Sequence, residues 1–152
     1  MNSRPAKSTK PTSFIAILSQ VGRLIFARNA ADHIARGRRG EEMAARVLRA
    51  KGFRILRRNF RPPRGGEIDI VARDQEVLVF VEVKARGGDD FGRPSVAVDR
   101  KKRRRIIMGA MSWLRLLDLP DIAFRFDIVE VIDDSEVTHI ENAFNLPEPL
   151  HY

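Results

Sequence analysis

Residues 67–86 read EIDIVARDQEVLVFVEVKAR, and this stretch decides the fold. Both halves are rich in Val, Ile and Phe, as strands are, and a polar break at 73–76 separates them. The pattern predicts a β-hairpin with a loop of about four residues. Side chains alternate between the faces of a strand, so Glu82 and Lys84 share one face, and the hairpin places Asp69 opposite Glu82. On the first strand the alternation predicts Ile68 and Ile70 together on the other face.

The segments on either side of the hairpin complete an α/β pattern. The stretch GEEMAARVLRAKGF (40–53) predicts a helix that begins near Gly40, and FRILRRNF (53–60) predicts a strand. A second helix is expected over about 95–117, followed by a strand at 123–132 and a shorter one, EVTHI, at 136–140. The order α-β-β-β-α-β-β predicts a mixed β-sheet flanked by helices. The buried face of the second helix is predicted to comprise Ile107, Ala110, Met111, Leu114 and Leu117.

The chain is expected to have three parts: a leader (1–36), a domain (37–144) and a Pro-containing tail (145–152). In the leader, apolar residues recur at helical spacing after Ser13, which predicts an amphipathic helix with Ser13 as its N-cap. Its basic, Ser-containing composition is shared with organelle transit peptides. Targeting or contact with a membrane surface, and packing on the domain or a partner, both remain open. No apolar run is long enough to predict a transmembrane helix.

The composition favours a polyanionic partner. The chain has 28 Lys and Arg against 20 Asp and Glu, a formal net charge of +8. This excess favours nucleic acid, or an anionic membrane surface. Cysteine is absent, which excludes disulfides and thiolate zinc sites. The three histidines, His33, His139 and His151, lack ligand spacing, so any metal ion is expected to be bound by oxygen.

The carboxylates of the hairpin are the candidate site. Two carboxylates opposite each other repel, and a divalent cation between them would remove that repulsion. Asp69, Glu82 and the Val83 carbonyl are expected to bind it, with waters filling the other positions as Mg²⁺ prefers. Glu41 is a third candidate ligand, and Lys84 would orient a water or offset charge on a phosphorus atom. Alternatively, Glu82 and Lys84 form an exposed ion pair worth less than ~1 kcal/mol.

Six motifs carry a family resemblance. They are, in order, GEEMAARVLRAKGF, GEIDIVA, FVEVKAR, FGRPSVAV, RFDIVEV and HIENAF. With them the chain resembles the PD-(D/E)xK nuclease superfamily, and more closely the YraN family of predicted endonucleases, similar to archaeal Holliday junction resolvases. The resemblance implies a restriction-endonuclease-like fold in which Asp69 and Glu82 bind Mg²⁺ or Mn²⁺. It also implies that Lys84 is the catalytic lysine and that Glu41 corresponds to the helical glutamate of the resolvases.

The expected function is therefore metal-dependent cleavage of DNA in the cytoplasm, with branched or structured DNA as a candidate substrate. Arg86, Lys102, Arg104 and Arg105 are expected to contact the nucleic acid, and Lys102 falls where the family has a helical lysine. The resolvases suggest a homodimer by analogy. The alternative is a non-catalytic module that binds nucleic acid or assembles a complex. A third possibility is a peripheral membrane protein held by the leader helix.

Overall fold

The computed structural model describes residues 14–63, 65–87, 98–118 and 121–147, with side chains from residue 31 onward. The chain divides into two compact units, Met1–Ile34 and Ala35–Tyr152, and the second contains the whole sheet. The element order agrees with the predicted α-β-β-β-α-β-β. The elements are α1 (Phe14–Ala50), β1 (Arg54–Phe60), β2 (Ile68–Asp74), β3 (Val77–Arg86), α2 (Arg100–Leu116), β4 (Phe124–Ile132) and β5 (Glu136–Phe144).

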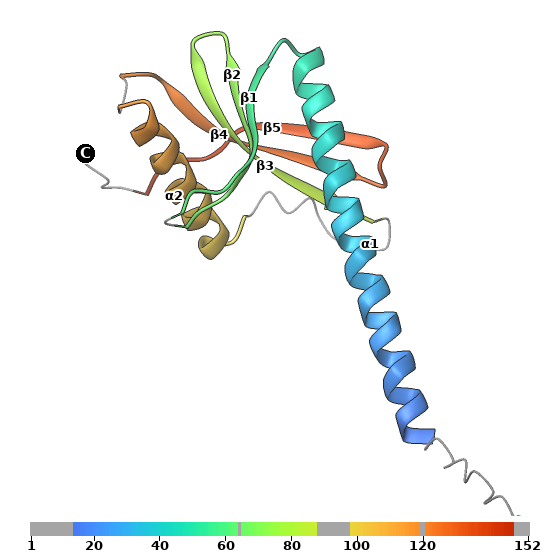
Figure 1. The fold of residues 1–152 in the computed structure, drawn as a ribbon. Coiled ribbons are helices and arrows are strands. Elements are labelled where there is room, and N and C mark those ends of the chain that lie inside the picture. The colour runs from blue at the N-terminus through green and yellow to red at the C-terminus, as the bar shows by residue number, and fades with distance from the viewer. Residues whose placement is uncertain (1–13, 64, 88–97, 119–120, 148–152) are drawn as a thin grey trace, which may run out of the picture. The chain divides into compact units, whose positions relative to one another are not determined.

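The five strands form one mixed sheet in the order β1-β2-β3-β4-β5 (Figure 1). All neighbours are antiparallel except β3 and β4, which run parallel. A parallel pair needs a crossover connection, and α2 lies in the connection between these two strands. The structure thus confirms the predicted α/β class and its mixed sheet.

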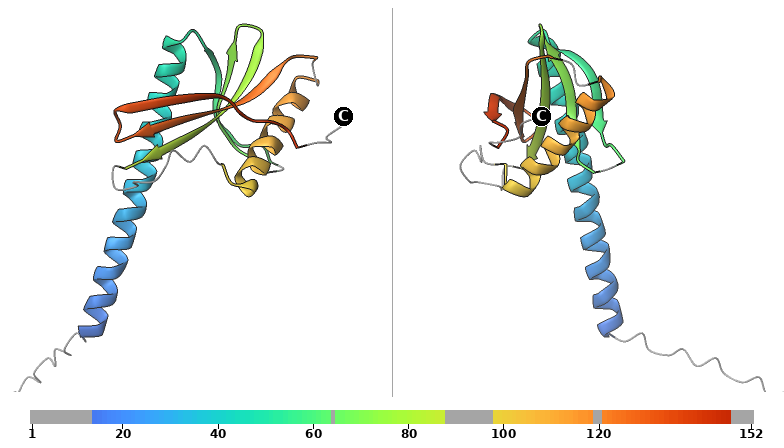
Figure 2. Two further views of the ribbon diagram at one scale, coloured as in Figure 1. Left: turned by 180° about the vertical axis from the view of Figure 1, so that it is seen from behind. Right: turned by 90° about the vertical axis from the view of Figure 1, so that its left-hand side faces the viewer.

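Each face of the sheet has its own apolar core. The α2-side core joins α2 to one face, and the α1-side core joins the C-terminal part of α1 to the other (Figure 2). Burial of these apolar side chains stabilises the sheet between the two helices. The α2-side core contains Ile68, Val71, Leu78, Phe80, Val98, Ile106, Ala110, Leu114, Phe126, Ile128 and Phe144. The α1-side core contains Ala44, Ala45, Leu48, Phe53, Ile70, Ala72, Val79, Val81, Val129 and Val131.

Helix α1 differs from the prediction because it does not begin at Gly40. It is continuous from Phe14 to Ala50, while Ser13, the predicted N-cap, lies outside the described residues. Gly40 allows the helix to approach β3 closely, because a Cβ at this position would lie 2.6 Å from Ala85 Cβ. No helix in the described part of the chain is long and apolar enough to cross a membrane.

Helix α2 is shorter than predicted. It begins at Arg100 after the N-cap Asp99, whose side chain accepts a hydrogen bond from the Lys102 amide at 2.8 Å. Residues 95–97, where the helix was expected to start, lie outside the described residues. The predicted apolar stripe was partly wrong, because Leu117 is 46% exposed. The buried residues are Ile106, Gly109, Ala110 and Leu114.

The hairpin is tighter than predicted. Asp74 pairs with Val77, which leaves a two-residue turn, and the register continues to Ile70 opposite Val81. Beyond this last pair, Asp69 Oδ2 accepts a hydrogen bond from the Val83 amide, which brings Asp69 close to Glu82. β5 is longer than expected, since it continues to Phe144.

The regular alternation of side chains between the two faces of the sheet is interrupted at the start of β2. Ile68 belongs to the α2-side core and Ile70 to the α1-side core, so the prediction that they share a face was wrong. The side chains of β2 therefore change faces between these two residues.

Gly66 lies just before β2, where the backbone packs closely against α2. An added Cβ would lie 2.5 Å from Gly109 N, and Gly66 has a φ of +85°, which disfavours any side chain. We expect Gly66→Ala to lower the free energy of unfolding by about 3 kcal/mol, from backbone strain and overpacking together. Chemical denaturation measures this loss.

Gly52 provides the matched control for this substitution. Its φ is +92°, but no atom lies within 4 Å of an added Cβ. Gly52→Ala should therefore cost only the backbone strain, about 1 kcal/mol. Equal losses for the two variants would show that the close contact between Gly66 and α2 contributes nothing to stability.

Candidate active site

Asp69 and Glu82 face each other on neighbouring strands. Asp69 Oδ2 accepts a hydrogen bond from the Val83 amide of β3 at 2.8 Å. The two carboxylates are close enough for the charge of Asp69 to raise the pKa of Glu82. Glu82 is only 6% exposed, which excludes the alternative of an exposed ion pair between Glu82 and Lys84.

This carboxylate pair has the electrostatics of a cation site. Burial, followed by the charge of Asp69, raises the pKa of Glu82 to about 7. Burial also raises the pKa of Asp69, although the hydrogen bond from Val83 opposes this shift. Within the described part of the chain, no hydrogen-bond donor reaches the buried oxygen Glu82 Oε2. A buried carboxylate oxygen without a donor, next to a second carboxylate, suits a hard divalent cation.

Lys84 lies two residues beyond Glu82 on β3, in register with Glu130 of β4. Alternation gives Lys84 the same face of the strand as Glu82. Burial is the main cause that lowers the pKa of the Lys84 ammonium, followed by the charge of Arg86. The carboxylates of Glu82, Glu130 and Asp99 act in the opposite direction. The ammonium is thus half-buried and lies in the field of the Glu82 carboxylate.

Lys102 of α2 links two carboxylates. Its Nζ lies 2.9 Å from Glu82 Oε1 and donates to Glu67 Oε1 at 2.7 Å. Glu67 also accepts a hydrogen bond from Arg105 at 2.9 Å. The hydrogen bond from Lys102 lowers the pKa of Glu67 more than its burial raises it. Sequence reasoning missed Glu67, although it stands two residues before Asp69 in the same motif.

Glu41 of α1 bonds to β1 and not to the carboxylate pair. Glu41 Oε2 accepts a hydrogen bond from Asn59 Nδ2 at 2.8 Å and lies 3.9 Å from Arg58. Both partners lie on β1, the strand beside Asp69. Among the described residues, no set of three His, Cys, Asp or Glu side chains is grouped closely enough to hold a metal ion. Among the residues the structure describes, Glu41 is therefore not a direct neighbour of the carboxylate pair.

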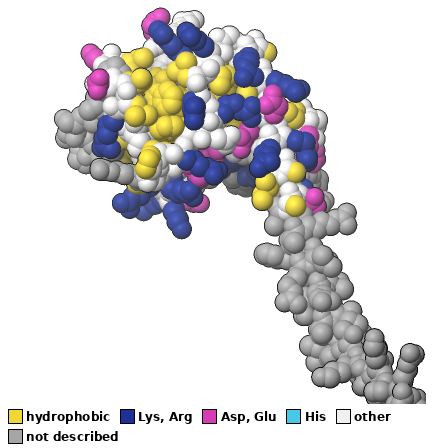
Figure 3. All heavy atoms as spheres, in the orientation of Figure 1, with side chains coloured by type: hydrophobic (Ala, Val, Ile, Leu, Met, Phe, Trp, Pro, Cys, Tyr) yellow, Lys and Arg dark blue, Asp and Glu magenta, His cyan; other side chains and the backbone are white. Residues whose placement is uncertain are grey.

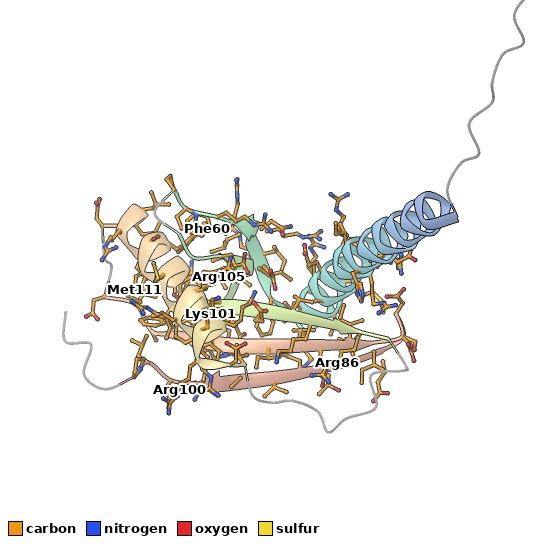
Figure 4. The ribbon with its side chains drawn as sticks, turned by 90° about the horizontal axis from the view of Figure 1, so that it is seen from below. Phe60, Arg86, Arg100, Lys101, Arg105 and Met111 are labelled. Atoms are coloured by element: carbon orange, nitrogen blue, oxygen red, sulfur yellow. The ribbon has the colours of Figure 1, made fainter. Side chains whose placement is uncertain are left out.

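The four residues expected to contact nucleic acid are dispersed. Lys102 and Arg105 bind Glu67, whereas Arg104 is exposed and Arg86 pairs with Glu130 at 3.0 Å. Figure 3 shows many Lys and Arg side chains on one face of the molecule, with fewer Asp and Glu among them. Figure 4 shows Arg100, Lys101 and Arg105 on the N-terminal half of α2, and Arg86 at the far end of β3. Of the four predicted residues, Lys102 of α2 pairs with a member of the carboxylate pair, at 2.9 Å from Glu82 Oε1.

The raised pKa of Glu82 predicts how stability depends on pH without metal. The folded state holds a proton on Glu82 up to a pH of about 7, while the unfolded chain releases it near its ordinary value of 4.5. Stability from this group is therefore present below about pH 4.5 and lost as the pH rises towards 7. We expect the free energy of unfolding to fall by about 1–3 kcal/mol more in wild type than in Glu82→Gln between pH 5 and 8.

Urea titrations at several pH values, with and without Mn²⁺, measure this difference. Mn²⁺ should reduce the loss at pH 8, because a cation that binds only the folded state stabilises it. If the free energy of unfolding changes with pH equally in wild type and Glu82→Gln, the raised pKa of Glu82 in the buried pair is contradicted.

The fold and the site together define a class: an α/β protein with a mixed five-stranded sheet, a buried carboxylate pair and a lysine two residues beyond the second carboxylate. Residues 40–131 match the model of a family described as "Uncharacterised protein family UPF0102". The chain belongs to this family. This confirms the YraN resemblance found in the motifs.

Three bacterial relatives illustrate the match. A UPF0102 protein of Persephonella marina is 43% identical over 111 residues, which are 73% of this chain and 94% of the relative. A UPF0102 protein of Geobacter sulfurreducens is 46% identical over 72% of this chain and 88% of its own length. A UPF0102 protein of Dechloromonas aromatica is 47% identical over 73% of this chain and 89% of its own length.

Proposed function

We propose that this protein is a metal-dependent endonuclease that hydrolyses phosphodiester bonds in DNA, with branched or structured DNA as its substrate, in the cytoplasm. The observation that carries this proposal is the buried pair Asp69 and Glu82, in which no donor from the described residues reaches Glu82 Oε2. Lys84 on the same strand adds the cation that phosphoryl transfer needs close to the reacting group. Such a combination is costly in a folded protein unless it has a ligand.

The chain's own oxygens would hold Mg²⁺ or Mn²⁺. Asp69 and Glu82 are the principal ligands, and the Val83 carbonyl is a third. Glu41, which bonds to Asn59 in this structure, would join this set when the ion is bound. The Val83 amide keeps the Asp69 carboxylate turned towards β3, because it donates to Oδ2 at 2.8 Å. Lys102 pairs with Glu82 Oε1 and leaves Oε2 for a cation. When bound, such an ion polarises a phosphoryl oxygen and lowers the pKa of a water.

The remaining roles fall to basic side chains. The Lys84 ammonium would orient the attacking water and offset the negative charge that develops on the phosphoryl oxygens. Glu67 pairs with both Lys102 and Arg105 of α2, and Lys102 also pairs with Glu82. These cations would fix the position of the DNA backbone relative to the scissile bond, through contacts that carry no sequence information. This favours recognition of DNA shape.

A specific observation also supports a second candidate, a non-catalytic nucleic-acid-binding module. Lys102 contacts both Glu67 and Glu82, so the acidic cluster is partly neutralised by the protein itself. Buried charges that are paired and hydrogen-bonded in this way can have a purely structural role. Under this alternative the basic α2 helix would bind nucleic acid without metal.

Incubation with a panel of linear, branched and nicked DNAs distinguishes the two candidates. The nuclease proposal predicts cleavage in Mg²⁺ or Mn²⁺ and none in a chelator, with Mn²⁺ binding detectable by calorimetry. The binding module predicts salt-dependent DNA binding with no cleavage and no heat of Mn²⁺ binding. That second set of results would reject the nuclease proposal.

A further inference from the structure

In both β1 and β2, the side chains switch from one face of the sheet to the other next to Asp69. Arg58 pairs with Ile70, and both lie on the α1 side, where Arg58 forms an ion pair with Glu42. Phe60 pairs with Ile68, and both pack into the α2-side core. Residues two apart on a regular strand share a face, so this exchange requires a local distortion in both strands.

Asn59 lies at the point of exchange on β1. It has a φ of +52°, in the left-handed region that non-glycine residues seldom adopt and that asparagine tolerates better than most. The register on either side of it places Asn59 opposite Asp69. The distortion thus falls on the two residues that face each other at the candidate site.

The distortion has a consequence for the direction of the Asp69 side chain. On a regular strand this side chain would stand perpendicular to the sheet. Here Asp69 Oδ2 instead accepts a hydrogen bond from the Val83 amide of the neighbouring strand, at 2.8 Å. The change of face between Ile68 and Ile70 accounts for this orientation of the carboxylate towards β3 and Glu82.

The side chain of Asn59 makes a second connection. Its Nδ2 donates a hydrogen bond to Glu41 Oε2 at 2.8 Å, which ties β1 to the carboxylate of α1. Since the Asn59 backbone lies opposite Asp69, one residue connects Glu41 with the carboxylate pair.

We propose that Asn59 is a positioning residue of the metal site. Its left-handed backbone allows β1 to follow the turn that directs Asp69 towards Glu82, and its amide holds Glu41 against β1, the strand next to the one that carries Asp69. Glu41 could then reach the cation directly or through a water. This inference rests on the proposed metal-dependent function, because it assigns Asn59 a role only if a divalent cation binds.

Mn²⁺ affinity measured by calorimetry on the full chain, without DNA, tests the inference. Asn59→Gly retains the left-handed backbone and removes the amide, so the fold should survive. We expect it to weaken Mn²⁺ binding about 10-fold, as loss of residues that orient metal ligands commonly does. Glu41→Gln should weaken Mn²⁺ binding to a similar extent. The double variant should bind Mn²⁺ no more weakly than whichever single variant has the lower affinity.

Asn142→Gly is the matched control, because Asn142 on β5 has a φ of +50°. This variant should bind Mn²⁺ like the wild type. If the wild type binds Mn²⁺ and Asn59→Gly binds it equally well, the role of Asn59 is refuted and the nuclease proposal stands. Losses for Asn59→Gly and Glu41→Gln that multiply in the double variant would also refute it. If the wild type itself binds no Mn²⁺, both proposals fail.

Discussion

Asp69→Asn is expected to abolish Mn²⁺ binding and to lower DNA cleavage by at least about 10³-fold. A metal ion supplies several kcal/mol of stabilisation to a phosphoryl-transfer transition state, and each ~1.4 kcal/mol corresponds to a factor of ten. Asparagine has nearly the same shape as aspartate, but it is neutral and cannot balance a divalent charge. Initial cleavage rates and Mn²⁺ calorimetry on the same preparation measure both effects.

The same variant should fold at least as well as the wild type without metal. Asp69 and Glu82 repel each other when both are ionised, and the charge of Asp69 raises the pKa of Glu82. Removal of that charge relieves the repulsion above pH 7, so the melting temperature should not decrease. Loss of activity with an intact fold would therefore reflect the chemistry of the site.

Asp121→Asn is the control for this experiment, since Asp121 is exposed and lies before β4. It removes the same charge from the molecule without touching the carboxylate pair. We expect its cleavage rate and Mn²⁺ affinity to match those of the wild type. Equal cleavage by Asp69→Asn and Asp121→Asn would exclude the proposed site.

Lys84→Met is expected to lower cleavage by about 10²–10³-fold while Mn²⁺ affinity changes little. Removal of one charged group that stabilises a transition state has an effect of this size. Methionine retains most of the aliphatic stem of lysine, so packing is largely preserved. Single-turnover cleavage rates at saturating Mn²⁺ separate the chemical step from metal and DNA binding.

Lys51→Met is the matched control for Lys84→Met. Lys51 lies just after α1, and its Nζ is 3.1 Å from His139 Nδ1, outside the candidate site. This variant should cleave at the wild-type rate. A single-turnover rate for Lys84→Met equal to that of the wild type would remove Lys84 from the mechanism.

Most of the fold could be predicted because its strands carry strong local signals. The β-branched residues of the hairpin identified β2 and β3, and the antiparallel pairing of these strands brings Asp69 to Val83, next to Glu82. The errors arose where packing overrides local pattern. Gly109 was not predicted to be buried, because its burial depends on close contact with Glu67 and Ile68.

The site could be predicted only in part. Spacing along the strands was sufficient to identify Asp69, Glu82 and Lys84 as candidates. It could not reveal that Lys102 connects Glu67 with Glu82, because Lys102 on α2 lies 35 positions after Glu67, which stands just before β2. The positive φ of Asn59 was also invisible, since an asparagine in a strand-like sequence gives no sign of a change of face.

The most direct measurement is a crystal structure of the protein soaked in Mn²⁺, with anomalous scattering recorded to locate the ion. The account predicts one strong peak coordinated by Asp69 Oδ1 or Oδ2 and by Glu82 Oε2, with Lys102 still on Glu82 Oε1. A map without a peak between the two carboxyl groups at saturating Mn²⁺ would contradict the account. The cluster would then be a structural network of acids and lysines.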